Sequence, residues 1–220
     1  MVSSAQSQPT NIETEIIPLP AEQVNSSMNM AQRRVRDAAV KISTGGGHGS
    51  GSYIAYKDVH LVLTAQHVTD GPIGSKYHVF KDKETRIATL VWSDAASDMA
   101  VLHLSEKFVT IEPMKWSPQN RIAEVGTEIT YSGYPSSHKL MTFSGKVAGY
   151  ADRATVGDHI ILNTYGWFGC SGSGIYNTDG EIIGILYGVD VQYAYGAQIQ
   201  ENMIWVAPIK NINIDLSGIA

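Results

Sequence analysis

From Val40 onward the chain alternates between short apolar runs and polar turns. Several of these runs alternate apolar and polar residues with a period of two, which is typical of half-buried strands. The full set of apolar runs is AAVKIST, GSYIAYK, HLVLTA, YHVF, RIATLVW and MAVLHL, followed by EITYSGY, FSGKVAGY, HIILNT, GIYN, EIIGILYGV and MIWVA. Turns such as GGGHG, TDG and NTDGE separate them. Short strands at this regular spacing predict an all-β barrel or sandwich.

The strand pattern breaks near the middle of the chain, in the Pro-bearing stretch EPMKWSPQ (112–119), which we interpret as the connection between two β units. We therefore expect a first β-barrel over residues 31–117 and a second over 118–220. Residues 1–30 are expected to form an N-terminal extension, whose start is rich in Ser, Gln, Thr and Pro. Residues 21–38 lack Pro and Gly and predict one short helix.

Composition narrows the class of protein. Hydrophobic residues make up 43% of the 220 and charged residues 17%, below the roughly 25% usual for soluble domains, so the chain is globular rather than disordered. The net charge of -5 argues against a nucleic-acid partner, which normally requires a basic surface. The one basic cluster, RRVR at 33–36, is interpreted as the solvated face of a helix.

The sequence also bears on the cellular compartment of the protein and on whether disulfides hold its fold. The N-terminus shows no basic region followed by an apolar run, and no apolar stretch approaches the ~18 residues that span a bilayer. We expect neither a signal peptide nor a membrane span, which favours a cytoplasmic or virus-encoded protein. Cys170 is the one cysteine, so no intrachain disulfide can form and the core must hold the fold.

Three local motifs contain candidate catalytic residues. TAQHV places His67 at the end of an apolar strand, SDMAVL places Asp98 directly before another, and GCSGSG places Ser171 between glycines. Each alone is compatible with an ordinary core histidine, turn aspartate or flexible loop. Together they supply a hydroxyl nucleophile, an imidazole to take its proton and a carboxylate to orient the imidazole. Asp94 is the competing carboxylate, although no apolar strand follows it directly.

These motifs resemble those of the chymotrypsin-like serine proteases of the trypsin fold, the PA clan. TAQHV is similar to the family's TAAHC/TNxHV histidine motif, SDMAVL to its aspartate motif and GCSGSG to its G-[DN]-S-G-G-P serine motif. The similarity is closest to the protease domain of the high-temperature-requirement (HtrA) group, here without a PDZ module. It extends over GSGSYIAYKDVHLVLTAQHV, EVGTEITYSGYPSSHKLMTFSGKVAGY, SGSGIYNTDGEIIGILYG and MIWVAPIKNI, or about Val40 to Asn213.

The resemblance implies two packed antiparallel six-stranded β-barrels with the site in the cleft between them. It implies a serine endopeptidase in which Ser171 attacks the scissile carbonyl, His67 is the general base and then the general acid, and Asp98 orients His67. The backbone N–H groups of Gly169 and Ser171 would form the oxyanion hole. No cofactor is implied, and the substrate is a polypeptide.

Substrate preference is also taken from the resemblance. Tyr165 and Gly166 should line the base of the specificity pocket, and Leu186, Tyr187, Gly188 and Val189 should form its wall and the strand that pairs with the substrate. Because no Asp or Glu stands at the base, a preference for Lys or Arg is disfavoured, and we expect small or apolar side chains before the scissile bond. Tyr165 is equally compatible with a core tyrosine.

The departures from the family pattern define the alternatives. Cys170 stands where the trypsin branch has an aspartate that pairs with a newly freed N-terminus, so activation by that ion pair is not expected. Trp167 and Phe168 make the loop before Gly169 bulkier than usual. A gated or inactive protease-like module that only binds peptides, and a dedicated viral-type processing protease, therefore remain as alternatives.

Two further expectations concern partners. The histidines outside TAQHV show no HxH or HxxxH spacing and no cysteine cluster, so no metal site is expected. Trimers are common among HtrA-like relatives, and the resemblance alone raises the possibility of a homo-oligomer.

Overall fold

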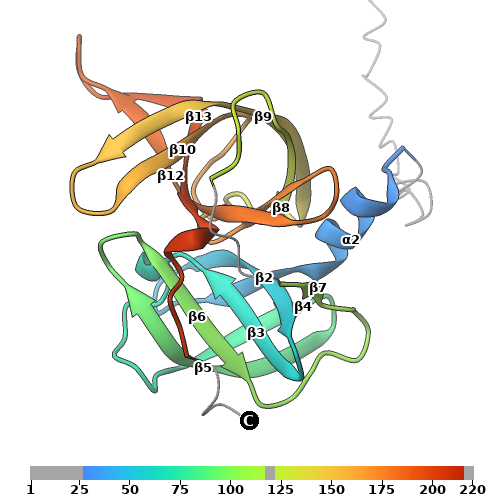
Figure 1. Cartoon of the computed structure of the whole chain (residues 1–220). Coiled ribbons are helices and arrows are strands. Elements are labelled where there is room, and N and C mark those ends of the chain that lie inside the picture. Colours follow the sequence, from blue (N-terminus) through green and yellow to red (C-terminus); the bar gives the residue numbers. More distant parts are fainter. Residues whose placement is uncertain (1–26, 117–121, 216–220) are drawn as a thin grey trace, which may run out of the picture.

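The computed structural model describes residues 27–116 and 122–215, which form one short helix and two antiparallel β-barrels (Figure 1). Residues 1–26, most of the predicted N-terminal extension, lie outside the described residues. The first barrel contains β1 (Ala39–Ser43), β2 (His48–Tyr56), β3 (Val59–Thr64), β4 (Lys76–Lys81), β5 (Glu84–Asp94) and β6 (Met99–Leu104). The second contains β8 (Glu128–Gly133), β9 (Met141–Arg153), β10 (Gly157–Asn163), β11 (Gly174–Asn177), β12 (Ile182–Gln192) and β13 (Gln198–Pro208).

Both sheets close on themselves. In the first, the order β1-β4-β5-β6-β3-β2 closes because β1 also pairs with β2. In the second, the order is β10-β13-β12-β11-β8-β9. Closure leaves each barrel with an interior filled by alternate side chains, which explains the period-two pattern in the sequence. The prediction of two packed six-stranded barrels is confirmed.

The helix α2 (Met30–Ala38) contacts both barrels. It begins at a capping box, in which the Asn29 side chain accepts from the Gln32 amide at 2.9 Å and the Gln32 side chain accepts from the Asn29 amide at 3.0 Å. Val35 is buried in the core of the first barrel. On the other side, the Arg36 guanidinium donates to the Thr142 hydroxyl of β9 at 2.9 Å. The helix ends where Ala39 enters β1 with extended backbone angles.

The end of the described chain makes a similar crossing. After β13, the short 3-10 helix η2 (Ile209–Asn211) leaves the second barrel, and the chain then runs down the first barrel (Figure 1). Ile209 and Ile212 are buried in the same hydrophobic cluster as the strands of the first barrel. Apolar burial at both crossings therefore opposes separation of the two barrels.

The segment between the barrels differs from the prediction in one detail. We expected residues 112–119 to break the strand pattern, yet Met114–Lys115 forms a short strand, β7, that pairs in parallel with β2. Met114 is buried in the first barrel, and the Trp116 amide donates to the Ala55 carbonyl at 3.0 Å. Burial of an apolar side chain outweighs the poor local propensity here. Residues 117–121, the rest of the connection, lie outside the described part.

Candidate active site

His67 and Asp98 meet at one corner of the first barrel. His67 lies on the 3-10 turn η1 (Gln66–Val68) that follows β3, and Asp98 lies directly before β6. Because β3 and β6 are antiparallel neighbours, with Thr64 paired to Ala100, the residue after one strand adjoins the residue before the other. The topology thus brings together two motifs that are separate in sequence.

The Asp98 carboxylate contacts His67 at two points. One oxygen lies 2.8 Å from Nδ1 of the imidazole, and the other accepts the His67 backbone N–H at 2.9 Å. This double contact orients the ring and leaves Nε2 as the nitrogen available for proton transfer. Both side chains are partly accessible to solvent, His67 at 46% and Asp98 at 21%.

Asp94, the competing carboxylate, has a different role. Its oxygens accept from the Ala96 amide, the Ser97 amide and the Ser97 hydroxyl, the last at 2.5 Å. These hydrogen bonds lower the pKa of Asp94, with the Ser97 hydroxyl as the largest cause. Asp94 therefore stabilises the turn before Asp98 and makes no hydrogen bond to His67 in the described part of the chain.

Ser171 lies in the loop between β10 and β11, flanked by two glycines in the left-handed region, Gly169 at φ 94° and Gly172 at φ 92°. Gly172 is required by packing as well, because a Cβ atom there would lie 2.0 Å from the Ser50 carbonyl oxygen. At this contact the loop that carries Ser171 packs on the first barrel beside Ala65, close to the start of η1. Among the described residues, Ser171 Oγ makes no hydrogen bond to His67.

The peptide between Phe168 and Gly169 has a defined orientation. The Phe168 carbonyl accepts the Ser136 amide at 2.7 Å, and no peptide bond in the described chain is cis. Since C=O and N–H point in opposite directions across a trans peptide, the Gly169 N–H points away from Ser136. Within the described residues, neither the Gly169 N–H nor the Ser171 N–H donates to a protein group. Two amides of the loop are thus left free beside the serine.

Ser50, a buried residue of β2, holds this loop from the first barrel. Its hydroxyl donates to the Gly169 carbonyl at 2.7 Å and accepts the Tyr134 amide at 3.0 Å. Its backbone amide donates to the Ser171 carbonyl at 2.8 Å, and its carbonyl accepts the Thr64 hydroxyl at 2.8 Å. One serine thereby fixes the loop that carries Gly169 and Ser171 relative to the strand that leads to His67.

Local sequence patterns indicate no role for Ser50 or Ser136. Ser50 lies in the GSGS segment, which contributed to the family resemblance but suggested no hydrogen-bonding partner. Ser136 lies in the turn after β8 and acts through its backbone amide, so its side chain offers no signal. Their partners are distant in sequence, which is why local patterns did not identify them.

The residues expected to form the specificity pocket are placed as follows. Tyr165 is 39% exposed, its ring packs on Phe143 at 5.3 Å between centroids, and its carbonyl accepts the Tyr131 hydroxyl. The Gly166 amide donates to the Glu201 carbonyl at 2.9 Å. Tyr165 thus lies at the rim of the second barrel with part of its ring accessible, compatible with the base of a pocket.

The β12 residues divide between core and surface. The Leu186 side chain is buried in the core of the second barrel, while its carbonyl accepts the Gly172 amide at 2.7 Å and its amide donates to Ser173. Leu186 therefore supports the serine loop through its backbone rather than presenting a side chain. Beyond Ile185, β12 pairs with β13 but no longer with β11, so no described strand pairs with the other edge of β12 from Tyr187 through Gly188 and Val189.

Tyr187 is fixed from the core side by a buried histidine. Its hydroxyl lies 2.9 Å from Nδ1 of His159, and the Arg153 guanidinium lies 5.9 Å from its ring centroid. Burial raises the pKa of Tyr187 to about 12, and burial together with Arg153 lowers the pKa of His159. The Asp98 charge acts on both groups and raises the pKa of each, against the lowering effect of Arg153.

Other chemistries find little support in the described residues. Within residues 27–116 and 122–215, no group of three or more His, Cys, Asp or Glu side chains is arranged to hold a metal ion. The Cys170 thiol is buried, and burial is the main cause of its raised pKa, which disfavours the reactive thiolate. None of the described helices is long and apolar enough to span a bilayer.

Comparisons with known proteins agree with this architecture. The family profile of the trypsin-like peptidase domain matches residues 49–185. The structure is similar to that of the Rv3671c protease from M. tuberculosis in its active form, with a TM-score of 0.64 and 18% identity over 94% of this chain and 89% of that chain. The inactive form of the same protease gives a TM-score of 0.64 and 18% identity over 86% and 90%.

A second neighbour is an HtrA-type protease, AlgW, with a tripeptide, at a TM-score of 0.63 and 22% identity over 81% of this chain and 58% of that chain. At these identities the neighbours show the fold alone. No curated protein sequence matches the chain.

Proposed function

Since the chain belongs to the trypsin-like peptidase domain family, whose substrates are polypeptides, we propose that it is a serine endopeptidase with Ser171, His67 and Asp98 as its catalytic triad. The observation that carries this proposal is the orientation of the Phe168–Gly169 peptide. It leaves the Gly169 and Ser171 amides free to stabilise an oxyanion, whereas a peptide turned the other way would place a carbonyl there. The contacts between Asp98 and His67 support the acid assignment.

The proposed reaction proceeds through an acyl-enzyme. Ser171 Oγ attacks the scissile carbonyl carbon while His67 Nε2 takes the hydroxyl proton, and Asp98 stabilises the resulting imidazolium. The carbonyl oxygen, now negative, accepts hydrogen bonds from the Gly169 and Ser171 amides. Collapse breaks the C–N bond, and the amine leaves with the proton from His67. Water then attacks the acyl ester by the same sequence, and Ser171 regains its proton.

For substrate preference, we propose small or apolar side chains before the scissile bond. Tyr165 and Gly166 would form the base of the pocket, without a carboxylate to bind Lys or Arg. The unpaired edge at Tyr187, Gly188 and Val189 would add the substrate main chain as a further antiparallel strand, with Leu186 holding that edge against the serine loop.

Fluorophosphonate labelling tests the proposal without a known substrate. Wild type and Ser171→Ala are treated in parallel, and the adduct is located by intact mass and peptide mapping. One adduct on Ser171, absent from Ser171→Ala and from heat-unfolded wild type, is expected. Folded wild type that takes no adduct would contradict an active endopeptidase and favour a module that only binds peptides.

A digest separates general from dedicated proteolysis. Casein and a synthetic peptide spanning residues 1–30 are incubated with wild type, and Ser171→Ala serves as the blank. Cleavage of casein at many sites is expected for a general endopeptidase. Cleavage of the N-terminal peptide alone would favour a dedicated processing protease.

A further inference from the structure

A cavity of about 730 Å³ lies between the C-terminal end of α2, the turn from β4 to β5 and the loop 134–140 that follows β8. Its walls are dominated by positive charge, with Arg36, Lys41, Lys81 and Lys139 against the carboxylates of Asp37 and Asp82. The whole chain has a net charge of -5, so this concentration of cations runs against the average surface. Such a cavity favours an anionic occupant.

Lys81 is the most constrained of these cations. It is 3% exposed, and its ammonium donates to the Arg36 carbonyl at 2.8 Å and the Ala39 carbonyl at 3.1 Å, both at the end of α2. An ammonium has three donors, and among the described residues no carboxylate lies within ion-pair distance of this one. Burial without a paired anion lowers its pKa to about 8. Two of the three ammonium donors are thus taken by backbone carbonyls, and Lys81 is among the residues that line the cavity.

The cavity adjoins the loop that bears the free amides. Tyr134, in its wall, accepts from His48 Nε2 at 2.8 Å through its carbonyl, and the same carbonyl packs against Gly169. The next residue but one, Ser136, holds the Phe168 carbonyl. The same loop contacts β12 through Gly172, whose amide donates to the Leu186 carbonyl at 2.7 Å. The cavity and the β12 edge therefore both adjoin the loop that carries Ser171.

We propose that this cavity binds an acidic side chain of the substrate on the leaving-group side of the scissile bond, with Lys81, Lys41 and Lys139 as its cationic partners. The proposal rests on the proposed endopeptidase function and adds a second determinant of specificity to it. A substrate carboxylate would supply the anion that Lys81 lacks within the protein, through charge-assisted hydrogen bonds.

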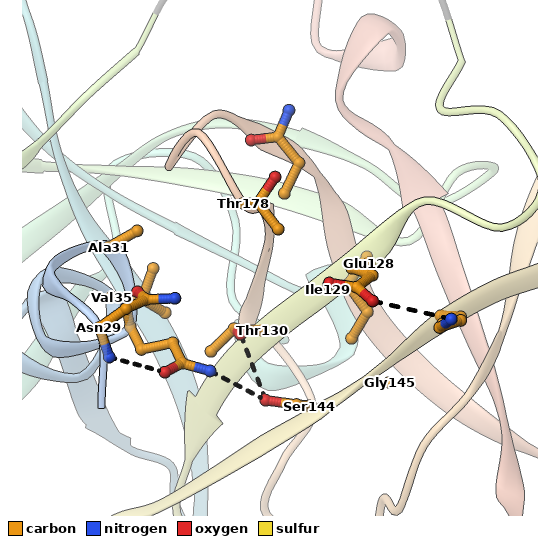
Figure 2. A pocket seen from close by; sticks show the side chains of 12 residues that line it. Asn29, Ala31, Val35, Glu128, Ile129, Thr130, Ser144, Gly145 and Thr178 are labelled. Carbon is orange, nitrogen blue, oxygen red and sulfur yellow. Dashed lines mark hydrogen bonds and ion pairs between the residues drawn. The ribbon is translucent and has the colours of Figure 1, made fainter. Parts of the chain in front are cut away.

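A second cavity does not offer this chemistry. It has a volume of about 370 Å³ and lies between α2, the start of β8 and β9, and the turn after β11 (Figure 2). Ser144 there lies 3.4 Å from the side-chain amide of Gln32 and 3.3 Å from the Thr130 hydroxyl (Figure 2). The charged side chains in its described lining, Lys146 and Glu128, lie 3.7 Å apart and pair with each other.

Binding is tested first on the catalytically blocked protein. Acetylated tetraglutamate amide and its tetraglutamine counterpart are titrated into Ser171→Ala by calorimetry. We expect the glutamate peptide to bind at least about tenfold more tightly, a gain typical of one or two charge-assisted contacts. Adding Lys41→Gln and Lys139→Gln should remove most of that difference, while Lys210→Gln, an exposed lysine outside the cavity, should leave it unchanged. Equal affinities, or an equal effect of Lys210→Gln, would overturn the proposal.

Location on the leaving-group side is tested by cleavage profiling. Wild type and Lys41→Gln/Lys139→Gln digest a proteome-derived peptide library, and cleavage sites are read by mass spectrometry. Enrichment of Asp and Glu after the scissile bond, lost in the double variant, is expected. Glutamate binding without such enrichment would overturn the assignment to the substrate. A wild type that cuts nothing defeats the proposed function but leaves the binding measurement interpretable.

Discussion

The Ser136 amide, in the turn after β8, donates to the Phe168 carbonyl, in the loop before β11, at 2.7 Å. Across the trans peptide, this bond points the Gly169 amide away from Ser136. Ser136 itself has a φ of 48°, in the left-handed region that disfavours residues with a Cβ. The backbone at Ser136 is thus strained where it orients the candidate oxyanion hole.

Replacing Ser136 tests that relationship. Ser136→Pro removes the amide hydrogen and forbids the observed φ, so the rate of fluorophosphonate labelling should fall by about 10²-fold, comparable to losing an oxyanion donor. Ser136→Gly keeps the amide and relieves the strain, so labelling should persist and the free energy of unfolding should rise by about 1 kcal/mol. Unchanged labelling of a folded Ser136→Pro would contradict the proposed role.

Asp98→Asn should show whether Asp98 or Asp94 is the carboxylate of the proposed triad. Asp98 has a φ of 54°, which Asn tolerates, so the backbone is preserved while the hydrogen-bonding pattern to His67 is lost. The turnover rate should fall by about 10⁴-fold. Asp94→Asn is the matched control, because it weakens only the turn and should leave turnover within about twofold while costing about 1 kcal/mol of stability. Steady-state kinetics and urea unfolding measure the two effects, and full activity in Asp98→Asn would refute the assignment.

Ser50→Ala should loosen the serine loop. The substitution leaves the Gly169 carbonyl and the Tyr134 amide without their partner, so the free energy of unfolding should drop by about 1–3 kcal/mol and labelling should slow. Ser52→Ala provides the comparison, because Ser52 is also buried on β2 but accepts from the Gly174 amide outside the Gly169 loop. Equal slowing in both variants would show that general destabilisation, rather than loop position, controls labelling.

The Cys170 thiol should resist alkylation in the folded protein. It is fully buried, and burial raises its pKa, so little thiolate is exposed to reagent near pH 8. Iodoacetamide should modify it slowly in buffer and rapidly in denaturant, as measured by intact mass. Rapid alkylation of the native protein would instead show that the loop opens.

Lys81 should make stability rise with alkaline pH. Its pKa falls from 10.5 to about 8 on folding, so between these values the unfolded chain binds more protons than the folded one. The free energy of unfolding should therefore increase across this interval, by about 3 kcal/mol from this group. The buried tyrosines, whose pKa is raised, act in the opposite direction above pH 10. The difference between wild type and Lys81→Met isolates the lysine, and parallel pH profiles would contradict the assignment.

Much of the architecture follows from local pattern. Alternation of apolar and polar residues predicted the strands of both barrels, because a closed sheet buries every second side chain. The motifs around His67, Asp98 and Ser171 predicted the candidate catalytic residues, because the chemistry of acyl transfer restricts the residue types. The buried strand β7 was missed, because two residues are too few to show a period.

The tertiary structure decided what depends on contacts between distant segments. The Phe168–Gly169 peptide is oriented by Ser136 and held by Ser50, and both act through hydrogen bonds whose partners lie far away in the chain. Likewise, Lys81 is an ordinary strand lysine in sequence and becomes a buried cation only where α2 ends against β4. Strands and reactive residue types are encoded locally, in the periodicity and side-chain chemistry of short segments. Peptide orientation, burial and charge pairing required the fold, because they are properties of neighbours in space.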